Sequence, residues 1–156
     1  MPDFSITIAP PTVESVEEIM PMLLEMHAEI GIFPLSIDKT IERVWSALAQ
    51  PWVFVAKDEA GTLLGSLALV RHEESAWYSD ATRTVLRDTW FYVREPYRKG
   101  RVGLDLMGRA ADAARETKLT VLVNVSNPRR RAKIHGAWME SELVGWVPLN
   151  HTIQLT

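Results

Sequence analysis

The pattern of apolar and polar positions at the start of the chain predicts a strand followed by a helix. Residues 4–9 alternate between apolar and polar side chains, which is typical of a half-buried strand. Ser15, with Glu18 three positions later, fits a capping box at the start of a helix. Because Pro21 lies inside the helical repeat that follows, we expect a kink there or a split into two short helices.

A second helix and a β-hairpin are predicted next. Ser36 or Asp38 can cap a helix that ends near Gln50. Residues 52–56 and 62–70 have the composition of strands, and the polar segment between them, which contains a glycine, predicts a turn. These two strands therefore form a hairpin in the expected fold.

The middle of the chain predicts a strand, a helix and a further strand. Residues 72–81 are polar and aromatic, which favours a loop or an irregular strand end. Residues 85–93 are rich in β-branched and aromatic side chains and predict a long strand. After a helix that ends near Thr117, residues 119–125 form a nearly continuous apolar run, typical of a strand covered on both faces.

The end of the chain completes a mixed order of elements. Residues 128–143 predict a helix, and residues 144–147 and 152–155 predict two short strands. No repeat, low-complexity segment or linker interrupts the pattern. We therefore expect one α/β domain over residues 1–156, with a mixed sheet flanked by about four helices.

Composition excludes several classes of protein. The 156 residues include no cysteine, which rules out a disulfide scaffold, a thiolate zinc site and a cysteine nucleophile. No apolar run approaches the roughly 18–20 residues that cross a bilayer, and the first residues lack the features of a secretory signal. A pI near 5.8 argues against a general nucleic-acid-binding protein. We therefore expect a cytoplasmic protein without a membrane segment.

Charge is unevenly distributed along the chain. The first sixty residues carry ten acidic and three basic side chains, whereas the remainder carries ten acidic and fourteen basic ones. An acidic half favours a cationic partner, such as an amine or a basic protein segment. Acidity that only maintains solubility is the alternative.

Residues 91–107 have the features of a phosphate-binding turn. A predicted strand leads through a basic loop with two glycines into the start of a helix, where unpaired amides and a partial positive charge favour an anion. Arg98, Lys99 and Arg101 add positive charge to this loop. A tight turn with solvated arginines is the alternative. The loop matches neither the nucleotide P-loop nor the dinucleotide fingerprint.

The spacing within this loop leads to a family resemblance. Val93 and Arg98 lie five residues apart, and Gly103 follows five residues later, with Gly100 and Arg101 between them. A strand ending in valine, followed by an R-x-x-G-x-G/A loop that opens a helix, is the signature of the GNAT superfamily of acetyl-CoA-dependent N-acyltransferases. The chain resembles this family, which usually has glycine at the position of Arg101.

Two further segments resemble the same family. The hairpin with Ala56, Gly61 and Gly65 is similar to the second and third strands of the family. Gly145 followed by Trp146 is similar to its closing pair of glycine and an aromatic residue. The expected order of elements also agrees over essentially the whole chain.

The resemblance implies a site for acetyl-CoA as co-substrate and implies no metal. In the family, two neighbouring strands splay apart and the pantetheine arm lies between them. The arm would bond to the backbone of the first strand, the diphosphate to the loop, and the outer phosphates to the start of the last helix. The residues assigned to the cofactor on this basis are Phe91, Tyr92, Val93, Arg98, Lys99, Gly100, Arg101, Val102, Gly103, Asn127 and Arg130.

The resemblance also implies direct transfer, in which an amine attacks the thioester and an acid protonates the leaving thiolate. Many relatives use a tyrosine on the last helix, four residues before the closing pair, and that position is Ser141 here. His135 on the same predicted helix is the other candidate for the acid. Each of the two also fits an ordinary helix residue.

The candidates for the base that deprotonates the amine are the carboxylates of Asp88 and of Glu73 or Glu74. Period two along the long strand places Asp88, Trp90 and Tyr92 on one face, which predicts a carboxylate beside aromatic walls. An ordinary surface charge is the alternative for each carboxylate.

The expected function is transfer of an acetyl group from acetyl-CoA to a primary amine on a small molecule or protein. The alternative is a non-catalytic acyl-CoA-binding or protein-interaction domain with the same fold. A third hypothesis is a phosphate- or nucleic-acid-contacting module that uses the basic clusters at residues 94–101 and 129–133. The sequence leaves the acceptor and the oligomeric state open, a homodimer included.

Overall fold

The computed structural model describes residues 2–31, 33–124, 146–149 and 152–155. Seven strands form one sheet in the order β1-β2-β3-β4-β5-β7-β6. All neighbouring strands are antiparallel except β4 and β5, which run parallel, so the predicted mixed sheet is confirmed. The strands are β1 (Phe4–Ile8), β2 (Val53–Asp58), β3 (Leu63–Ser75), β4 (Thr82–Val93), β5 (Thr120–Asn124), β6 (Trp146–Leu149) and β7 (Thr152–Leu155).

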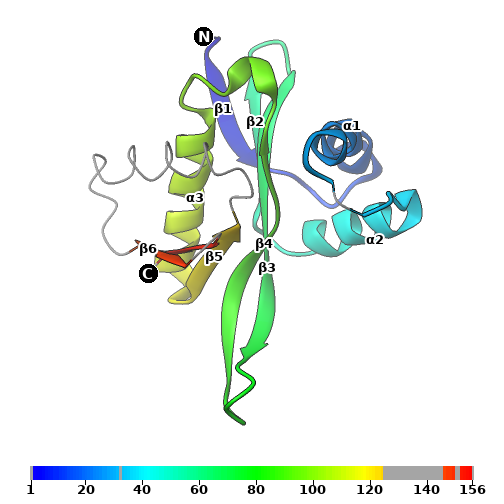
Figure 1. The fold of residues 1–156 in the computed structure, drawn as a ribbon. Coiled ribbons are helices and arrows are strands. Elements are labelled where there is room, and N and C mark those ends of the chain that lie inside the picture. Colours follow the sequence, from blue (N-terminus) through cyan, green and yellow to red (C-terminus); the bar gives the residue numbers. More distant parts are fainter. Residues whose placement is uncertain (1, 32, 125–145, 150–151, 156) are drawn as a thin grey trace.

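The described helices cover the sheet on both faces (Figure 1). Helices α1 (Val13–Ile30) and α2 (Ile37–Leu48) lie on one face, and α3 (Val102–Thr117) lies on the other. Each face has its own apolar core: Ile19, Met22 and Val44 are buried on the first, and Leu86 and Leu106 on the second. The described residues thus contain three of the roughly four helices expected. The predicted helix at 128–143 lies outside them.

Helix α1 departs from its prediction at the start and in the middle. Thr12 is the N-cap, because its Oγ1 accepts the Ser15 amide hydrogen bond at 3.2 Å, and the helix begins at Val13. The predicted capping box at Ser15 is therefore placed three residues too late. The predicted split at Pro21 is also wrong, since α1 is continuous over 18 residues. Pro21 is exposed, while buried Ile19 and Met22 on either side of it anchor the helix in the core.

Other element predictions hold with shifted ends. Ser36 is the N-cap of α2, with its hydroxyl oxygen accepting the Lys39 amide at 3.4 Å. The polar stretch after residue 71, expected as a loop or an irregular strand end, continues β3 as far as Ser75, which pairs with Thr82 of β4. Strands β3 and β4 thus form a long ribbon that projects beyond the other strands (Figure 1). The tip of the ribbon exposes Trp77 and Tyr78.

Candidate functional site

The parallel strands β4 and β5 part in the middle of the sheet. They pair only from Val85 with Thr120 to Arg87 with Leu122. Beyond that point β4 continues to Val93 beside β3, and β5 continues to Asn124 beside β7. Among the described strands, the two therefore face each other across an unpaired edge. Backbone groups at such an edge are ready to pair with a ligand or another chain.

A β-bulge in β4 lies next to the parting. Ala68 of β3 pairs with Trp90, but the next residue, Leu69, pairs with Asp88, so Thr89 is the extra residue. Asp88 consequently lies on the α3 face, whereas Trp90 packs in the core beneath α1 and α2.

The bulge overturns the prediction that Asp88 shares a strand face with Trp90 and Tyr92. Both aromatic residues belong to the core on the α1 and α2 face, whereas Asp88 lies on the opposite face, which α3 covers. Period two applies only to an uninterrupted strand, and one extra residue exchanges the two faces.

The backbone of β4 past the bulge presents alternate residues to the parting. The Arg94 amide donates to the Leu64 carbonyl of β3 at 2.9 Å, so Arg94 and Tyr92 direct their peptide groups toward β3. Phe91 and Val93 therefore direct theirs toward β5. Of the three strand residues predicted for the cofactor, these two have the backbone orientation that can receive an extended ligand.

The loop after β4 leads into a helix start that has no side-chain cap. A 3₁₀ turn, η1 (Glu95–Tyr97), is followed by α3, whose N-cap Arg101 makes no side-chain capping bond. The amides of Arg98 and Gly100 donate within the turn, at 3.3 and 3.4 Å. The first-turn amides of α3 have no acceptor inside the helix, so these are the amides that can hold an anion.

The cationic side chains of the loop have different surroundings. Lys99 and Arg101 are exposed, and Arg101 pairs with Asp105 at 3.2 Å. The Arg98 guanidinium instead turns toward α1, where it pairs with Glu29, and its Nε donates to the Val93 carbonyl at 2.8 Å. Arg98 thus links the end of β4 to α1, a contact that the sequence analysis did not foresee.

Gly65 and Gly103 have different steric surroundings. A Cβ at Gly65 would lie 2.9 Å from the Tyr92 carbonyl oxygen and 3.2 Å from a methyl group of Val102, so only glycine fits between β3, β4 and α3. A Cβ at Gly103 would meet Val93 and Phe91 at 3.6 and 3.8 Å, which is ordinary contact. Gly103 therefore has room for a small residue, as the G/A position of the resembled signature does.

Asp88 lies at the narrow end of the parting, one residue beyond the last β4–β5 pair. Its Oδ1 accepts a hydrogen bond from Nδ2 of Asn124 on β5 at 3.4 Å, which bridges the two strands. Burial raises the pKa of Asp88 to about 6, against the opposing effects of Asn124 and Arg87. A carboxyl group with this pKa can accept a proton at neutral pH.

Glu73, the other predicted base, does not lie beside Asp88. Glu73 lies on the projecting ribbon, four positions along β3 from the partner of Asp88, and accepts a hydrogen bond from the Thr84 hydroxyl at 2.6 Å. That spacing corresponds to roughly 13 Å along a strand. Ser141 and His135, like Asn127 and Arg130, which were predicted to contact the cofactor, lie outside the described residues. Within the part of the chain that is described, no group of three potential metal ligands occurs.

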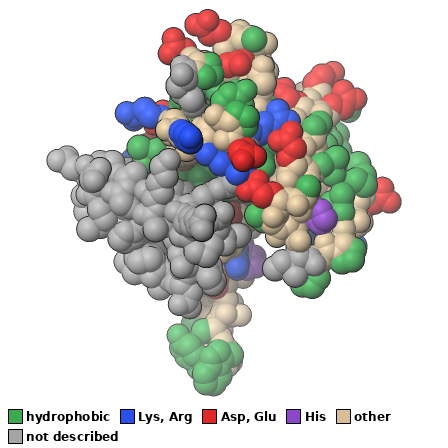
Figure 2. Space-filling view, turned by 45° about the horizontal axis from the view of Figure 1, so that its top comes forward, with side chains coloured by type: hydrophobic (Ala, Val, Ile, Leu, Met, Phe, Trp, Pro, Cys, Tyr) green, Lys and Arg blue, Asp and Glu red, His purple; other side chains and the backbone are tan. Residues whose placement is uncertain are grey.

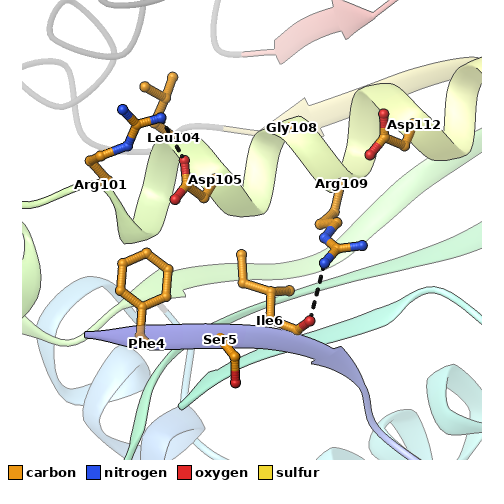
Figure 3. Close-up of a pocket in the computed structure, with 9 residues that line it drawn as sticks. All are labelled: Phe4, Ser5, Ile6, Arg101, Leu104, Asp105, Gly108, Arg109 and Asp112. Atoms are coloured by element: carbon orange, nitrogen blue, oxygen red, sulfur yellow. Dashed lines mark hydrogen bonds and ion pairs between the residues drawn. The ribbon is translucent and has the colours of Figure 1, made fainter. Parts of the chain in front are cut away.

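A separate groove of about 580 Å³ lies between β1 and α3 (Figure 3). Phe4 and Ile6 of β1 form one side, and Leu104 and Arg109 of α3 lie on the other. Arg109 reaches across and donates to the Ile6 carbonyl at 3.2 Å. This groove is at the edge strand of the sheet, whereas the β4–β5 parting lies in its interior.

Comparisons with known proteins identify the fold. No family model and no curated protein matches the chain, but solved structures do. A Clostridium acetobutylicum protein described as a predicted acetyltransferase, solved with acetyl-CoA, matches at TM-score 0.68 and 16% identity, over 95% of this chain and 96% of that chain. A GNAT-family acetyltransferase from Staphylococcus aureus matches at TM-score 0.66 and 11% identity, over 97% of both chains.

A third match adds an acceptor complex. An aminoglycoside acetyltransferase from an uncultured soil sample, solved with sisomicin, matches at TM-score 0.59 and 16% identity, over 95% of this chain and 93% of that chain. The strand order, the parting of the two parallel strands and these matches agree with the resemblance read from the loop. The protein has the fold of the GNAT acetyltransferases.

Proposed function

We propose that this protein transfers an acetyl group from acetyl-CoA to a primary amine by direct attack. The observation that carries the proposal is the parting of β4 from β5, with the uncapped start of α3 following at the end of the same strand. An extended arm and an anionic group on one ligand would match these two features. Acetyl-CoA has this combination, and a solved neighbour of the same fold is described with it.

The residues present fit such a co-substrate. Phe91 and Val93 offer backbone groups to the arm, although Arg98 already donates to the Val93 carbonyl, so the Val93 amide and both groups of Phe91 are the expected contacts. The amides at the start of α3 are expected to hold the diphosphate, with Lys99 and Arg101 adding charge. When bound, acetyl-CoA supplies an activated thioester carbonyl.

Asp88 is the proposed base for the incoming amine. An amine is protonated at neutral pH and must lose a proton before it can act as a nucleophile. With its pKa raised to about 6 by burial, Asp88 is mostly ionised at pH 7 and can take that proton directly or through one water. Ser141 and His135 remain the candidates for the acid that protonates the leaving thiolate.

The acceptor is proposed only as a class. The neighbour described with sisomicin acts on an aminoglycoside, a polyamine compound. The acidic first part of this chain favours a cationic acceptor as well. These two observations support an amine as the acceptor and leave its identity to experiment.

The test measures thiol release from acetyl-CoA across a panel of amines. We expect release with the parent protein, and a kcat lower by about 100-fold for Asp88→Asn, which retains the shape but loses the base. Asp112→Asn removes an exposed α3 carboxylate paired with Arg115 and serves as the matched control. Glu73→Gln tests the other predicted base. If this variant loses activity and Asp88→Asn does not, the base is Glu73.

The alternative function gives a different result in the same experiments. A non-catalytic acyl-CoA-binding domain would be stabilised thermally by coenzyme A and would release no thiol with any amine. Absence of coenzyme A binding by calorimetry would overturn both hypotheses.

A further inference from the structure

Four charged side chains join the last turns of α1 to the loop after β4. Glu25 and Glu29 lie four residues apart, on one face of α1. Arg94 and Arg98 lie on either side of the turn η1. The Arg94 guanidinium makes a two-point contact with Glu25, at 2.9 and 3.0 Å, and the Arg98 guanidinium pairs with Glu29. Two neighbouring ion pairs therefore connect the helix to the loop. Acidic and basic side chains also adjoin on the face of the molecule that Figure 2 shows.

The two ion pairs have different second partners. Arg94 also donates to the Leu63 carbonyl at 3.1 Å, which ties α1 to the start of β3. Arg98 donates to the Val93 carbonyl, and its guanidinium lies over the Tyr92 ring at 5.2 Å. Only the second pair therefore touches the end of β4 at the parting.

Glu29 holds two groups of this second pair at once. Its Oε2 accepts hydrogen bonds from the Tyr92 hydroxyl, at 2.8 Å, and from the Arg98 guanidinium. The hydrogen bond from Arg98 lowers the pKa of Glu29, so the carboxylate stays ionised. Burial, reinforced by Glu29, raises the pKa of Tyr92 to about 12, so the hydroxyl remains a donor. One carboxylate from α1 thus orients a strand residue and a loop residue.

This arrangement reaches the proposed cofactor site through Arg98. The side chain of Arg98 fastens the loop to the Val93 carbonyl, and the start of α3 follows four residues later. Without Glu29 the guanidinium would lose this ion pair, which weakens its hold on that carbonyl. The amides at the start of α3 would then be less well placed relative to β4.

We propose that Glu29 is a positioning residue for the cofactor loop, holding Arg98 against β4 and thereby setting the affinity for coenzyme A. The inference rests on the proposed function, because it concerns the same site. It adds a role for α1, which lies on the opposite face of the sheet from α3.

The test compares two neutralised carboxylates on the same face of α1. Glu29→Gln and Glu25→Gln each weaken one ion pair to the loop, but only Glu29 contacts Arg98 and Tyr92. By calorimetry we expect the Kd for coenzyme A to rise on the order of tenfold for Glu29→Gln and to stay within about twofold for Glu25→Gln. The Tm without ligand should fall by a similar small amount in both.

Tyr92→Phe provides a second variant if Glu29→Gln does not fold. It removes one hydrogen bond to Glu29 and keeps the ring beneath the guanidinium, so we expect a Kd increase of about threefold. Unchanged affinity in Glu29→Gln, or equal losses in Glu29→Gln and Glu25→Gln, would overturn the positioning role. If the parent protein itself does not bind coenzyme A, the proposed function fails, and this inference with it.

Discussion

The two halves of β4 differ in how many neighbours they have. Residues 85–87 pair with β3 on one side and β5 on the other, and Val85 and Leu86 are fully buried. Residues 90–93 pair with β3 alone among the described strands. The first half is therefore held by strands on both sides, whereas the second half has a strand on one side only in the described part of the chain, and its other edge is where we propose that coenzyme A binds.

The bulge at Thr89 separates these halves. It lies one residue beyond Asp88 and turns the following side chains to the opposite faces of the sheet. The last parallel pair at Arg87, the carboxylate of Asp88 and the bulge at Thr89 are therefore consecutive in β4.

The largest effect is expected at the start of α3. Gly103→Glu places a negative charge at the amides that we assign to the diphosphate, and the Kd for coenzyme A should rise at least about 100-fold by calorimetry. Gly108→Glu, on the same helix, is the matched control, since a Cβ atom at Gly108 meets no atom within 4 Å. Equal affinities in the Gly103→Glu variant and the parent would show that this helix start does not face the ligand.

A large change in stability is expected on the paired side of β4. Gly65→Ala would bring its Cβ 2.9 Å from the Tyr92 carbonyl oxygen, and we expect a loss of about 1–3 kcal/mol in the free energy of unfolding. Denaturant titration measures this loss. Gly108→Ala, in open space on α3, should instead stabilise by up to about 1 kcal/mol. An unchanged free energy of unfolding in Gly65→Ala would contradict the close packing of β3, β4 and α3.

The pH dependence of the reaction tests Asp88. Because its pKa is raised to about 6 and the base must be ionised, kcat/KM should fall about tenfold per pH unit below pH 6. The acceptor amine also gains a proton as the pH falls, so the profile is compared with that of Asp88→Asn. A break near pH 6 that persists in the variant would assign the titration to another group.

The stability of Asp88→Asn is expected to differ from that of the parent in a pH-dependent way. A carboxyl group whose pKa is raised in the folded state stabilises it fully at low pH and loses that contribution as the pH rises through about 6. Asp88→Asn should therefore be more stable than the parent at pH 7.5, by up to about 3 kcal/mol for a pKa raised from 3.8 to about 6, and about equal to it near pH 4. Thermal unfolding at the two pH values provides the measurement, and a variant less stable at pH 7.5 would contradict the burial of the charge.

Much of the fold could be predicted from local patterns. The strands at residues 52–56 and 85–93, and the apolar strand that became β5, follow from periodicity and β-branched composition. Ser36 was among the predicted caps and is the one used. Errors occurred where packing opposed a local rule, as at Pro21, which lies within a helix anchored by buried neighbours on both sides.

Less of the candidate site could be predicted from such patterns. The loop of residues 98–103 was found because glycines, basic residues and a helix start occur together. Glu29 was missed, although its spacing of four residues from Glu25 placed both on one helix face. Asn124 was missed because no local signal distinguishes it from any other polar residue at a strand end.

The sequence by itself determined the order of the elements, the mixed sheet and the loop that resembles the GNAT signature. Side-chain periodicity, caps and glycines are properties of neighbours along the chain, so they can be read without coordinates. Only the tertiary structure decided where β4 leaves β5, which face Asp88 takes and which partner Arg98 finds. These outcomes depend on residues far apart in the chain, such as Glu29 and Arg98 at a separation of 69 positions, and on strand register that no local pattern encodes.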